Sequence, residues 1–553
     1  MKINWERMTL IFVGILTLLR LAVAPTFGLG VDEAHYFLYA RFLDWSYVDH
    51  PPLVGWTHWP LYALFGTNEF LVRLPAILLF AGVSFFVYRF TFSFSKSGLI
   101  SFLSVVAINS SFILNAMSIM LLPDCFLMLL IFPLMTAILK ITEVGETRYY
   151  VYLGLLLGLA GLAKYTAILF VPPLLAFLFI KKRYDLLFSP KMLLAAGIAL
   201  LMVIPVLYWN IQHDFISFRY QGGHVLAATS PSVKSFLVSL LAQFGAYSPL
   251  LFLMAFYGLY KSWKSKDDRI RLSVLFGVVI LLFFFYSSLY ERTLPHWPSL
   301  FYLLFIPVGG YYLLSAGSST KRKYFYFSVG FSLTITLFLY AALPAKWFTF
   351  PDYKSPFRDI VGFETIAREG DAILRQDPAA RIEIPERDVT GKERIAREGK
   401  ALIRPNGNLP QGEAVATNLT NPGAAVVPAS SVGAVGEASR LGSSGSGVVP
   451  PPTPRALAVT NWTMGSRMLY YNLPYRHDVF VMDDRKDQFD VWQQAAPKGY
   501  DLLFVTTHFH HAIISETYRC TAVEPVKKMD VILNGGKVDT IDFIWCRNYQ
   551  GSR

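Results

Sequence analysis

The sequence predicts a polytopic α-helical membrane protein with about eleven transmembrane helices and a small C-terminal α/β domain outside the membrane. Of the 553 residues, 54% are hydrophobic and 16% are charged, whereas a soluble domain usually carries about 25% charged residues. Apolar runs recur from the N-terminus to residue 343, and the hydropathy then falls to that of a soluble segment. Together, these two observations indicate a membrane protein with a soluble C-terminal part.

A helix that crosses a bilayer needs about 20 apolar residues. The fifth and sixth apolar runs are close together around Lys164, so we expect short or broken spans there. The N-terminal run lacks a convincing small-x-small cleavage site and is read as a retained first helix. We expect spans near residues 8–28, 70–92, 97–115, 119–140, 150–163, 165–181, 191–210, 233–260, 270–289, 297–316 and 323–343.

The net charge of +12 does not indicate nucleic-acid binding, because the basic residues form short clusters between apolar runs. Every cluster falls at the N-terminus or on an even-numbered connection. The positive-inside rule therefore places the N-terminus and these connections in the cytoplasm. An odd number of spans then places the C-terminal domain on the opposite, periplasmic side. The polar segments predicted on that outer face are 30–69, 116–124, the Lys164 junction, 211–232 and 290–296.

The C-terminal half changes composition twice. We expect a membrane domain over 1–343, a connector over 344–364, a Gly-, Pro- and Ser-rich flexible insertion over 365–455, and the α/β domain over 456–553. In that domain "ALAVTNW", "VFVM" and "YDLLFVTT" predict strands, "MGSRMLYYN" predicts a helix, and "VILNGGKVDTIDFIW" predicts a hairpin around an Asn-Gly turn. Cys520 and Cys546 could pair in an oxidising compartment, but their spacing does not decide it.

Two acidic motifs follow the first span. Asp32 and Glu33 could supply a general base or a metal ligand near the bilayer surface, or Asp32 could cap an interfacial helix. Asp49 and His50 precede two prolines that stiffen the loop. His50 could donate a hydrogen bond to a phosphate, or the motif could be only a turn.

The outer ends of later spans supply further candidates. Asp124 follows Leu-Leu-Pro and could be either a site carboxylate or a helix-start residue. Lys164 lies between two apolar runs with no basic neighbour, which favours a functional role over a snorkelling anchor. Two outer loops could form an anion-binding wall from His213, Arg219, His224, Arg292 and His296.

The three histidines of "THFHHA", His508, His510 and His511, have the letters of a metal site. They follow a predicted strand without a matching Cys or acid cluster, so we expect no metal there.

The motifs together resemble a known family. "VDEAHY", "HPPL", "GTNEFLVRLPAILL", "LPD" and "GLAKYTA" are similar to the bacterial branch of the dolichyl-phosphate-mannose–protein mannosyltransferase-like GT-C glycosyltransferases, which includes the 4-amino-4-deoxy-L-arabinose lipid A transferases. The resemblance covers roughly 8–343 and continues more weakly over 456–545, through "MGSRMLYYNLP" and "DQFDVW". The residue before Pro-Pro-Leu is His50, as in the protein mannosyltransferases, whereas the arabinose transferases usually carry Lys.

The resemblance implies an inverting transferase in the bacterial inner membrane. It would move a sugar from a polyprenyl-phosphate donor to a lipid, glycan or protein acceptor. Asp32, with Glu33 beside it, matches the first-loop carboxylate and would be the base, and Asp124 would orient the acceptor or Asp32. The donor phosphate would bind Lys164, His50, and Arg219 or Arg292. Asp49, His213, His224 and His296 would contact substrate, and a divalent metal (Mg or Mn) is possible but not required.

The residues leave two alternatives to a glycosyltransferase. A transporter or lipid flippase should show repeats with helices broken near the midplane, and no such pairing is visible. A membrane-anchored sensor would not need about eleven spans. The sequence names neither the sugar nor the acceptor.

Overall fold

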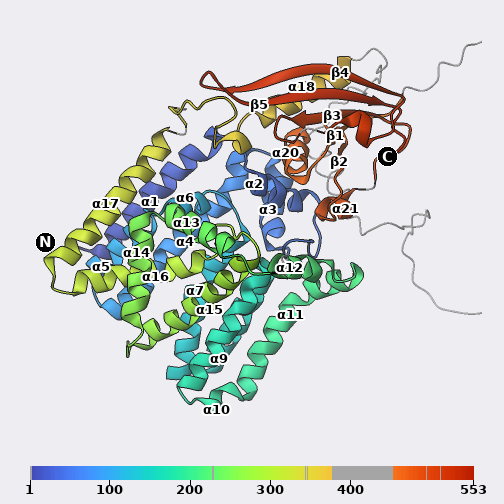
Figure 1. Ribbon diagram of the computed structural model, residues 1–553. Coiled ribbons are helices and arrows are strands. Elements are labelled where there is room, and N and C mark those ends of the chain that lie inside the picture. The colour runs from blue at the N-terminus through green and yellow to red at the C-terminus, as the bar shows by residue number, and fades with distance from the viewer. Residues whose placement is uncertain are drawn as a thin grey trace, which may run out of the picture. The chain divides into compact units, whose positions relative to one another are not determined.

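Figure 1 shows the fold of a computed structural model of the chain. The structure describes residues 3–226, 230–342, 344–345, 347–376, 453–493, 495–510 and 512–553. The first half of the membrane part contains α1 (Trp5–Val23), η1 (Ala24–Thr26), α2 (Val31–Arg41), α3 (Leu53–Phe65), α4 (Glu69–Ser95), α5 (Gly98–Ile108), α6 (Phe112–Met117), α7 (Pro123–Glu143), α8 (Thr147–Ala163), η2 (Tyr165–Phe170) and α9 (Val171–Ile180). The second half contains α10 (Tyr184–Leu187), α11 (Pro190–Gln212), α12 (Ile216–Leu226), α13 (Val233–Ala246), α14 (Pro249–Ser262), α15 (Asp268–Tyr290), α16 (Ser299–Ser315) and α17 (Ser319–Ala342).

Within the described residues, six helical segments are long and apolar enough to cross a membrane: α1 with η1, α4, α7, α11, α15 and α17. The segments α5, η2 with α9, and α16 are apolar but shorter. The chain is therefore a multi-pass membrane protein, as predicted. The expected count of eleven spans is not confirmed.

The expected span over 233–260 is not one straight helix. It is divided into α13 and α14, whose axes differ by 107°. Ser248, at the break, has φ +69°, a conformation that an α-helix does not accommodate. Pro249 then starts α14 at its first position, where the missing N–H costs nothing.

Three of the basic connections meet at one face of the bundle. Lys181 forms an ion pair with Asp268 at 2.7 Å. The Arg183 guanidinium donates to the Thr142 carbonyl at 2.9 Å, and the Lys191 ammonium donates to the Gly145 carbonyl at 2.9 Å. The connections after α7, α9 and α14 thus share a face, as the charge pattern predicts.

The C-terminal domain is a five-stranded mixed sheet in the order β2-β1-β3-β5-β4. Strand β1 pairs in parallel with β2 and β3, and β5 pairs antiparallel with β3 and β4. The predicted hairpin is confirmed, since Asn534 and Gly535 both have positive φ, as a two-residue turn requires. The elements are η3 (Arg358–Ile360), α18 (Phe363–Gln376), β1 (Arg455–Val459), α20 (Trp462–Asn472), β2 (Val479–Val481), α21 (Gln488–Trp492), β3 (Asp501–Thr507), α22 (Ile514–Thr517), β4 (Ala522–Leu533) and β5 (Gly536–Arg547).

Residues 365–376, which we expected to begin the flexible insertion, form most of α18 instead. The buried residues of this helix recur at helical spacing, and they include Ile366, Gly370 and Leu374. Gly370 lies against the side chains of Leu457 and Phe543 in the sheet. Of the rest of the predicted insertion, 377–452 lies outside the described residues, and its last expected residue, Arg455, begins β1 instead.

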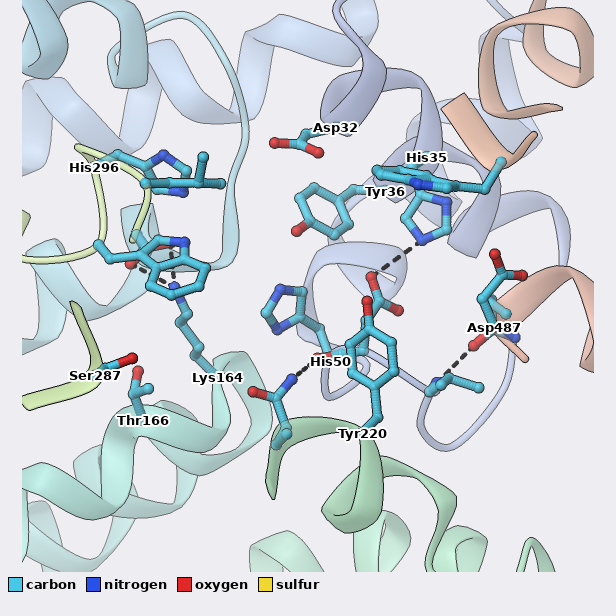
Figure 2. Close-up of a pocket in the computed structure, with 18 of the residues that line it drawn as sticks. Asp32, His35, Tyr36, His50, Lys164, Thr166, Tyr220, Ser287, His296 and Asp487 are labelled. Carbon is cyan, nitrogen blue, oxygen red and sulfur yellow. Dashed lines mark hydrogen bonds and ion pairs between the residues drawn. The ribbon is translucent and has the colours of Figure 1, made fainter. Parts of the chain in front are cut away.

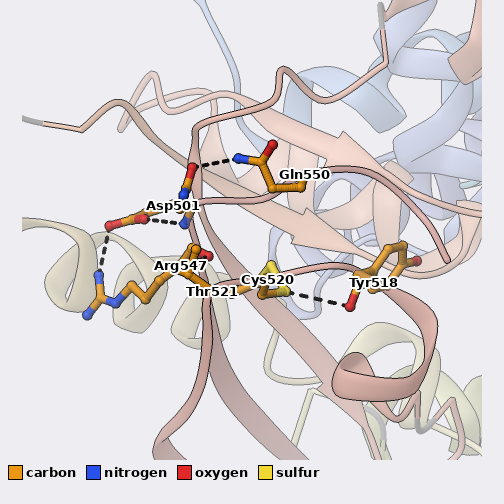
Figure 3. Close-up of a disulfide and its surroundings, with 8 residues drawn as sticks. Asp501, Tyr518, Cys520, Thr521, Arg547 and Gln550 are labelled. Atoms are coloured by element: carbon orange, nitrogen blue, oxygen red, sulfur yellow. Dashed lines mark hydrogen bonds and ion pairs between the residues drawn. A yellow bond between two sulfur atoms is a disulfide. The ribbon is translucent and has the colours of Figure 1, made fainter.

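A disulfide joins Cys520, just before β4, to Cys546 in β5, across 26 residues of sequence (Figure 3). It lies beside a polar cluster in which Arg547 and Asp501 form an ion pair at 3.1 Å. The spacing of the two cysteines could not predict this bond; in the structure the pairing of β4 with β5 places Val523, three residues after Cys520, opposite Cys546.

The C-terminal domain docks on the first outer loop. The backbone N–H of Leu29 donates to the Tyr471 hydroxyl at 2.8 Å, and the N–H of Val48 donates to the Gln488 side chain at 2.6 Å. These contacts bring residues more than 400 positions apart to one site.

Candidate active site

A cavity of about 260 Å³ opens where the first outer loop, the starts of α7 and η2, α12, the segment before α16 and the C-terminal domain meet. Figure 2 shows the side chains that line it. Six of the predicted site residues face this one space: Asp32, Asp49, His50, Asp124, Lys164 and His296.

Asp32 lies in the first turn of α2, next to its N-cap Gly30. Among the described residues its carboxylate has no hydrogen bond and no ion pair, and it faces the cavity (Figure 2). Burial raises the pKa of Asp32 above its ordinary value, and nearby His35 offsets part of the rise. An unpartnered carboxylate with a raised pKa is well suited to accept a proton.

Glu33 does not line the cavity, contrary to the expectation that it stands beside Asp32 in the site. Successive helical residues point about 100° apart. The Glu33 carboxylate is therefore directed inward, where it accepts hydrogen bonds from Arg73 at 2.7 and 2.9 Å and from the Gly30 N–H at 2.9 Å. The pair is completely buried and ties α2 to α4.

Lys164 and Asp124 form a buried ion pair at one side of the cavity. The Lys164 ammonium donates to both Asp124 oxygens, at 2.8 and 2.7 Å. Lys164 has an extended backbone and separates α8 from η2, which agrees with the expected break in this region. Asp124 occupies the first turn of α7 after Pro123.

Asp49 and His50 have different surroundings although they are adjacent. Asp49 accepts hydrogen bonds from the Tyr39 hydroxyl and from His35 Nε2, the latter at 3.1 Å. Burial opposes ionisation of Asp49, but His35 outweighs it and lowers the pKa of Asp49. Burial lowers the pKa of His50 to about 4, and its buried Nδ1 has no hydrogen-bond partner within the described ranges of the chain.

His296, in the segment before α16, lines the cavity on the same side as Lys164 (Figure 2). Burial lowers its pKa to about 4, with Asp124 opposing the shift. His296 and His50 are therefore neutral imidazoles at neutral pH.

Three predicted binding residues lie elsewhere. Arg219 and Arg292 are exposed and do not line the cavity. His213 stacks on the Trp209 ring with centroids 3.9 Å apart. Tyr220 and Gln221, which directly follow Arg219 in α12, line the cavity instead. The side chain of His224 lies outside the described part of the chain.

The wall of the cavity that the C-terminal domain contributes was not predicted from the sequence. This wall includes Trp462, Arg485, Asp487 and Gln488. The motif "DQFDVW", quoted above for the family resemblance, begins with Asp487 and Gln488. That signal was available, but nothing in the sequence placed this loop against the first outer loop.

No group of three His, Cys, Asp or Glu side chains that could hold a metal ion occurs in the described residues. His508, from the histidine-rich motif, stacks on Tyr353 with ring centroids 4.2 Å apart. His511 lies outside the described residues.

Sequence comparison agrees with the resemblance. Residues 49–209 match the family model described as dolichyl-phosphate-mannose-protein mannosyltransferase. Over 270 residues, the chain is 24% identical to the lipid A galacturonosyltransferase RgtD of Rhizobium johnstonii. This match covers 48% of the chain and 57% of the relative's own length.

Structural comparison extends over nearly the whole chain. The crystal structure of ArnT from Cupriavidus metallidurans in the apo state has a TM-score of 0.57 and 14% identity, with 97% of each chain covered. The structure of ArnT bound to undecaprenyl phosphate has a TM-score of 0.54 and 13% identity, with the same coverage. The chain therefore has the fold of ArnT, and its residues 49–209 are similar in sequence to the dolichyl-phosphate-mannose-protein mannosyltransferase family.

Proposed function

We propose that the protein is an inverting glycosyltransferase that moves a sugar from a polyprenyl-phosphate donor to a hydroxyl of a lipid acceptor. The observation that carries the proposal is that Asp32, a carboxylate without a partner among the described residues, shares one cavity with the Lys164 ammonium. A base and a cation in one pocket are what such a transfer needs.

The phosphate of the donor binds at the Lys164 side. The ammonium supplies charge, and Asp124 positions it through the 2.7 Å ion pair. His50 supplies a hydrogen bond, because it lines the cavity and its Nδ1 has no partner in the part of the chain that the structure describes. The structure of ArnT bound to undecaprenyl phosphate supports a polyprenyl phosphate as the carrier.

Asp32 accepts the proton of the acceptor hydroxyl. The acceptor oxygen forms a bond to the anomeric carbon while the bond from that carbon to the phosphate oxygen breaks. The electron pair leaves with the phosphate, and its added charge is stabilised by Lys164 and His50. Displacement in one step inverts the anomeric configuration. The reaction requires no Mg²⁺ or Mn²⁺, because side chains can neutralise a monophosphate leaving group.

The outer face of the inner membrane is the proposed location of the site. The three basic connections that meet through Lys181, Arg183 and Lys191 then face the cytoplasm together with the N-terminus. The C-terminal domain is periplasmic, which agrees with its disulfide. The name of RgtD, a lipid A galacturonosyltransferase, supports lipid A or a similar glycolipid as the acceptor.

Mass spectrometry of envelope glycolipids and glycoproteins, from cells with and without the gene, tests the proposal. We expect one class of molecule to lose a single sugar residue and the polyprenyl-phosphate donor to accumulate. Loss of the sugar with the polyprenyl-linked donor trapped on the cytoplasmic side would instead identify a flippase, and unchanged envelope glycans would refute both functions.

A further inference from the structure

We propose that the C-terminal domain reads the sugar of the donor, and that this sugar carries a carboxylate: Arg485 binds the carboxylate and Asp487 accepts hydrogen bonds from the sugar hydroxyls. This inference rests on the proposed function and deepens it, since it names a hexuronic acid as the class of sugar. The evidence comes from two side chains that line the cavity and lack partners suited to them.

Asp487 is the first of these side chains. Its Oδ1 accepts the Phe489 N–H at 2.8 Å and caps α21. Its Oδ2 is buried and has no hydrogen-bond partner among the residues that the structure describes, and the residue is only 7% exposed. Burial raises the pKa of Asp487 to about 6, as expected for a carboxylate whose acceptor capacity is not filled. Leaving such an oxygen unsatisfied is costly, so a ligand with hydroxyl donors gains by filling it.

Arg485 is the second. Its guanidinium lies over the rings of Tyr220 and Trp462, 5.4 and 5.6 Å from their centroids, and it also donates to the Tyr220 hydroxyl. In the described part of the chain it makes no ion pair with a carboxylate. A guanidinium held by two aromatic rings keeps its remaining donors in a fixed plane, which matches the geometry of a carboxylate.

Trp462 adds a surface suited to a sugar ring. It lines the cavity beside Arg485 and belongs to the first turn of α20. An indole face packs well against the apolar C–H face of a pyranose. The three residues together offer a stacking surface, a hydroxyl acceptor and an anion-binding fork.

The anion at Arg485 could be a sugar carboxylate or the carrier phosphate. Figure 2 favours the carboxylate: Lys164 and Asp487 lie at opposite sides of the cavity, with His50 and Tyr36 between them. A phosphate held by Lys164 and His50 leaves the sugar to extend toward the C-terminal domain.

The test measures binding to the full-length protein in detergent. The probes are undecaprenyl phosphate, undecaprenyl-phosphate-galacturonate and undecaprenyl-phosphate-galactose. We expect the wild type to prefer the galacturonate probe over the galactose probe. Arg485→Met should weaken binding of the galacturonate probe at least tenfold and remove the preference for it over the galactose probe. Asp487→Asn, which keeps a capping side chain, should weaken binding of both glycosylated probes severalfold. Neither variant should change the affinity for undecaprenyl phosphate.

Lys486→Met is the matched control, because Lys486 is exposed between the two residues and does not line the cavity. If Arg485→Met weakened binding of undecaprenyl phosphate as much as binding of the galacturonate probe, Arg485 would bind the phosphate. That result would overturn the inference. Unchanged binding of both glycosylated probes by both variants would overturn it as well. A wild type that binds none of the three probes would refute the proposed function itself.

Discussion

The ammonium of Lys164 lies 2.7 Å from Oδ2 and 2.8 Å from Oδ1 of Asp124, and the pair is buried at the edge of the cavity. The two residues are 40 positions apart, one at the start of α7 and the other at the end of α8. A buried ion pair is weak evidence for stability, because its desolvation cost can exceed its Coulombic gain. A role in holding an anionic substrate explains better why both charges lie here.

Variants of this ion pair should therefore separate its effect on the stability of the fold from its effect on lipid binding. The first is Lys164→Met. The single variant leaves the Asp124 charge buried without a partner. It should lower the free energy of unfolding by about 3–5 kcal/mol. The double variant Lys164→Met/Asp124→Asn should regain most of that stability, yet it should still bind undecaprenyl phosphate at least tenfold more weakly than the wild type.

Thermal unfolding in detergent and lipid-binding titrations measure the two effects. Lys140→Met is the control, because Lys140 and Glu143 form a 2.8 Å pair that is exposed and should contribute about 0–1 kcal/mol. A double variant that binds the lipid like the wild type would remove Lys164 from the phosphate site.

Glu33→Gln should affect the fold and not the chemistry. It leaves the completely buried Arg73 guanidinium without its counter-ion, which should lower the free energy of unfolding by about 3–5 kcal/mol. Folded molecules should bind undecaprenyl phosphate with wild-type affinity, because Glu33 does not line the cavity. A stable variant with impaired lipid binding would place Glu33 in the site after all.

The sequence predicted the part of the site that local patterns encode. Lys164 was recognisable as an isolated cation between apolar runs, and Asp32 and His50 belonged to specific motifs. Helical periodicity could have separated Asp32 from Glu33, since neighbours on a helix do not face the same way. Arg73, the isolated arginine in "EFLVRLP", indicated a buried cation that needs an acidic partner. Only the tertiary structure shows that this partner is Glu33.

Tertiary packing decided the rest. Arg485 and Asp487 reach the cavity because the loop before α21 docks on the first outer loop through Val48 and Gln488. No spacing or periodicity joins segments so far apart. Arg219 and Arg292 were expected in the site but do not line the cavity, because a loop's composition does not say which of its side chains turn inward.

The pH dependence of lipid binding should report on His50. Burial lowers its pKa to about 4, and a bound phosphate would raise this pKa by favouring the imidazolium. By linkage, the affinity for undecaprenyl phosphate gains a favourable contribution as the pH falls from 7 toward 5. His50→Gln should lack this contribution, and the difference between the two pH profiles isolates it from titration of the lipid. Parallel profiles for wild type and variant would exclude His50 from the phosphate site.

Removal of the disulfide should destabilise the C-terminal domain. Cross-linking across 26 residues removes conformational entropy from the unfolded chain, worth about 3.5 kcal/mol in the chain-entropy model. The variant Cys520→Ser/Cys546→Ser should therefore unfold at a lower temperature than the oxidised protein. A reducing agent should lower the unfolding temperature of the wild type and leave that of the variant unchanged. Equal unfolding temperatures with and without the bond would contradict this account.

The most direct test of the proposed chemistry is the Asp32→Asn variant, assayed for both transfer and lipid binding. Asn keeps the size of the side chain but cannot accept the acceptor's proton. The account predicts a loss of transfer of about 10²–10⁴-fold, with undecaprenyl phosphate bound as in the wild type. Transfer at the wild-type rate by Asp32→Asn would contradict the assignment of Asp32 as the base, and with it the mechanism proposed for the cavity.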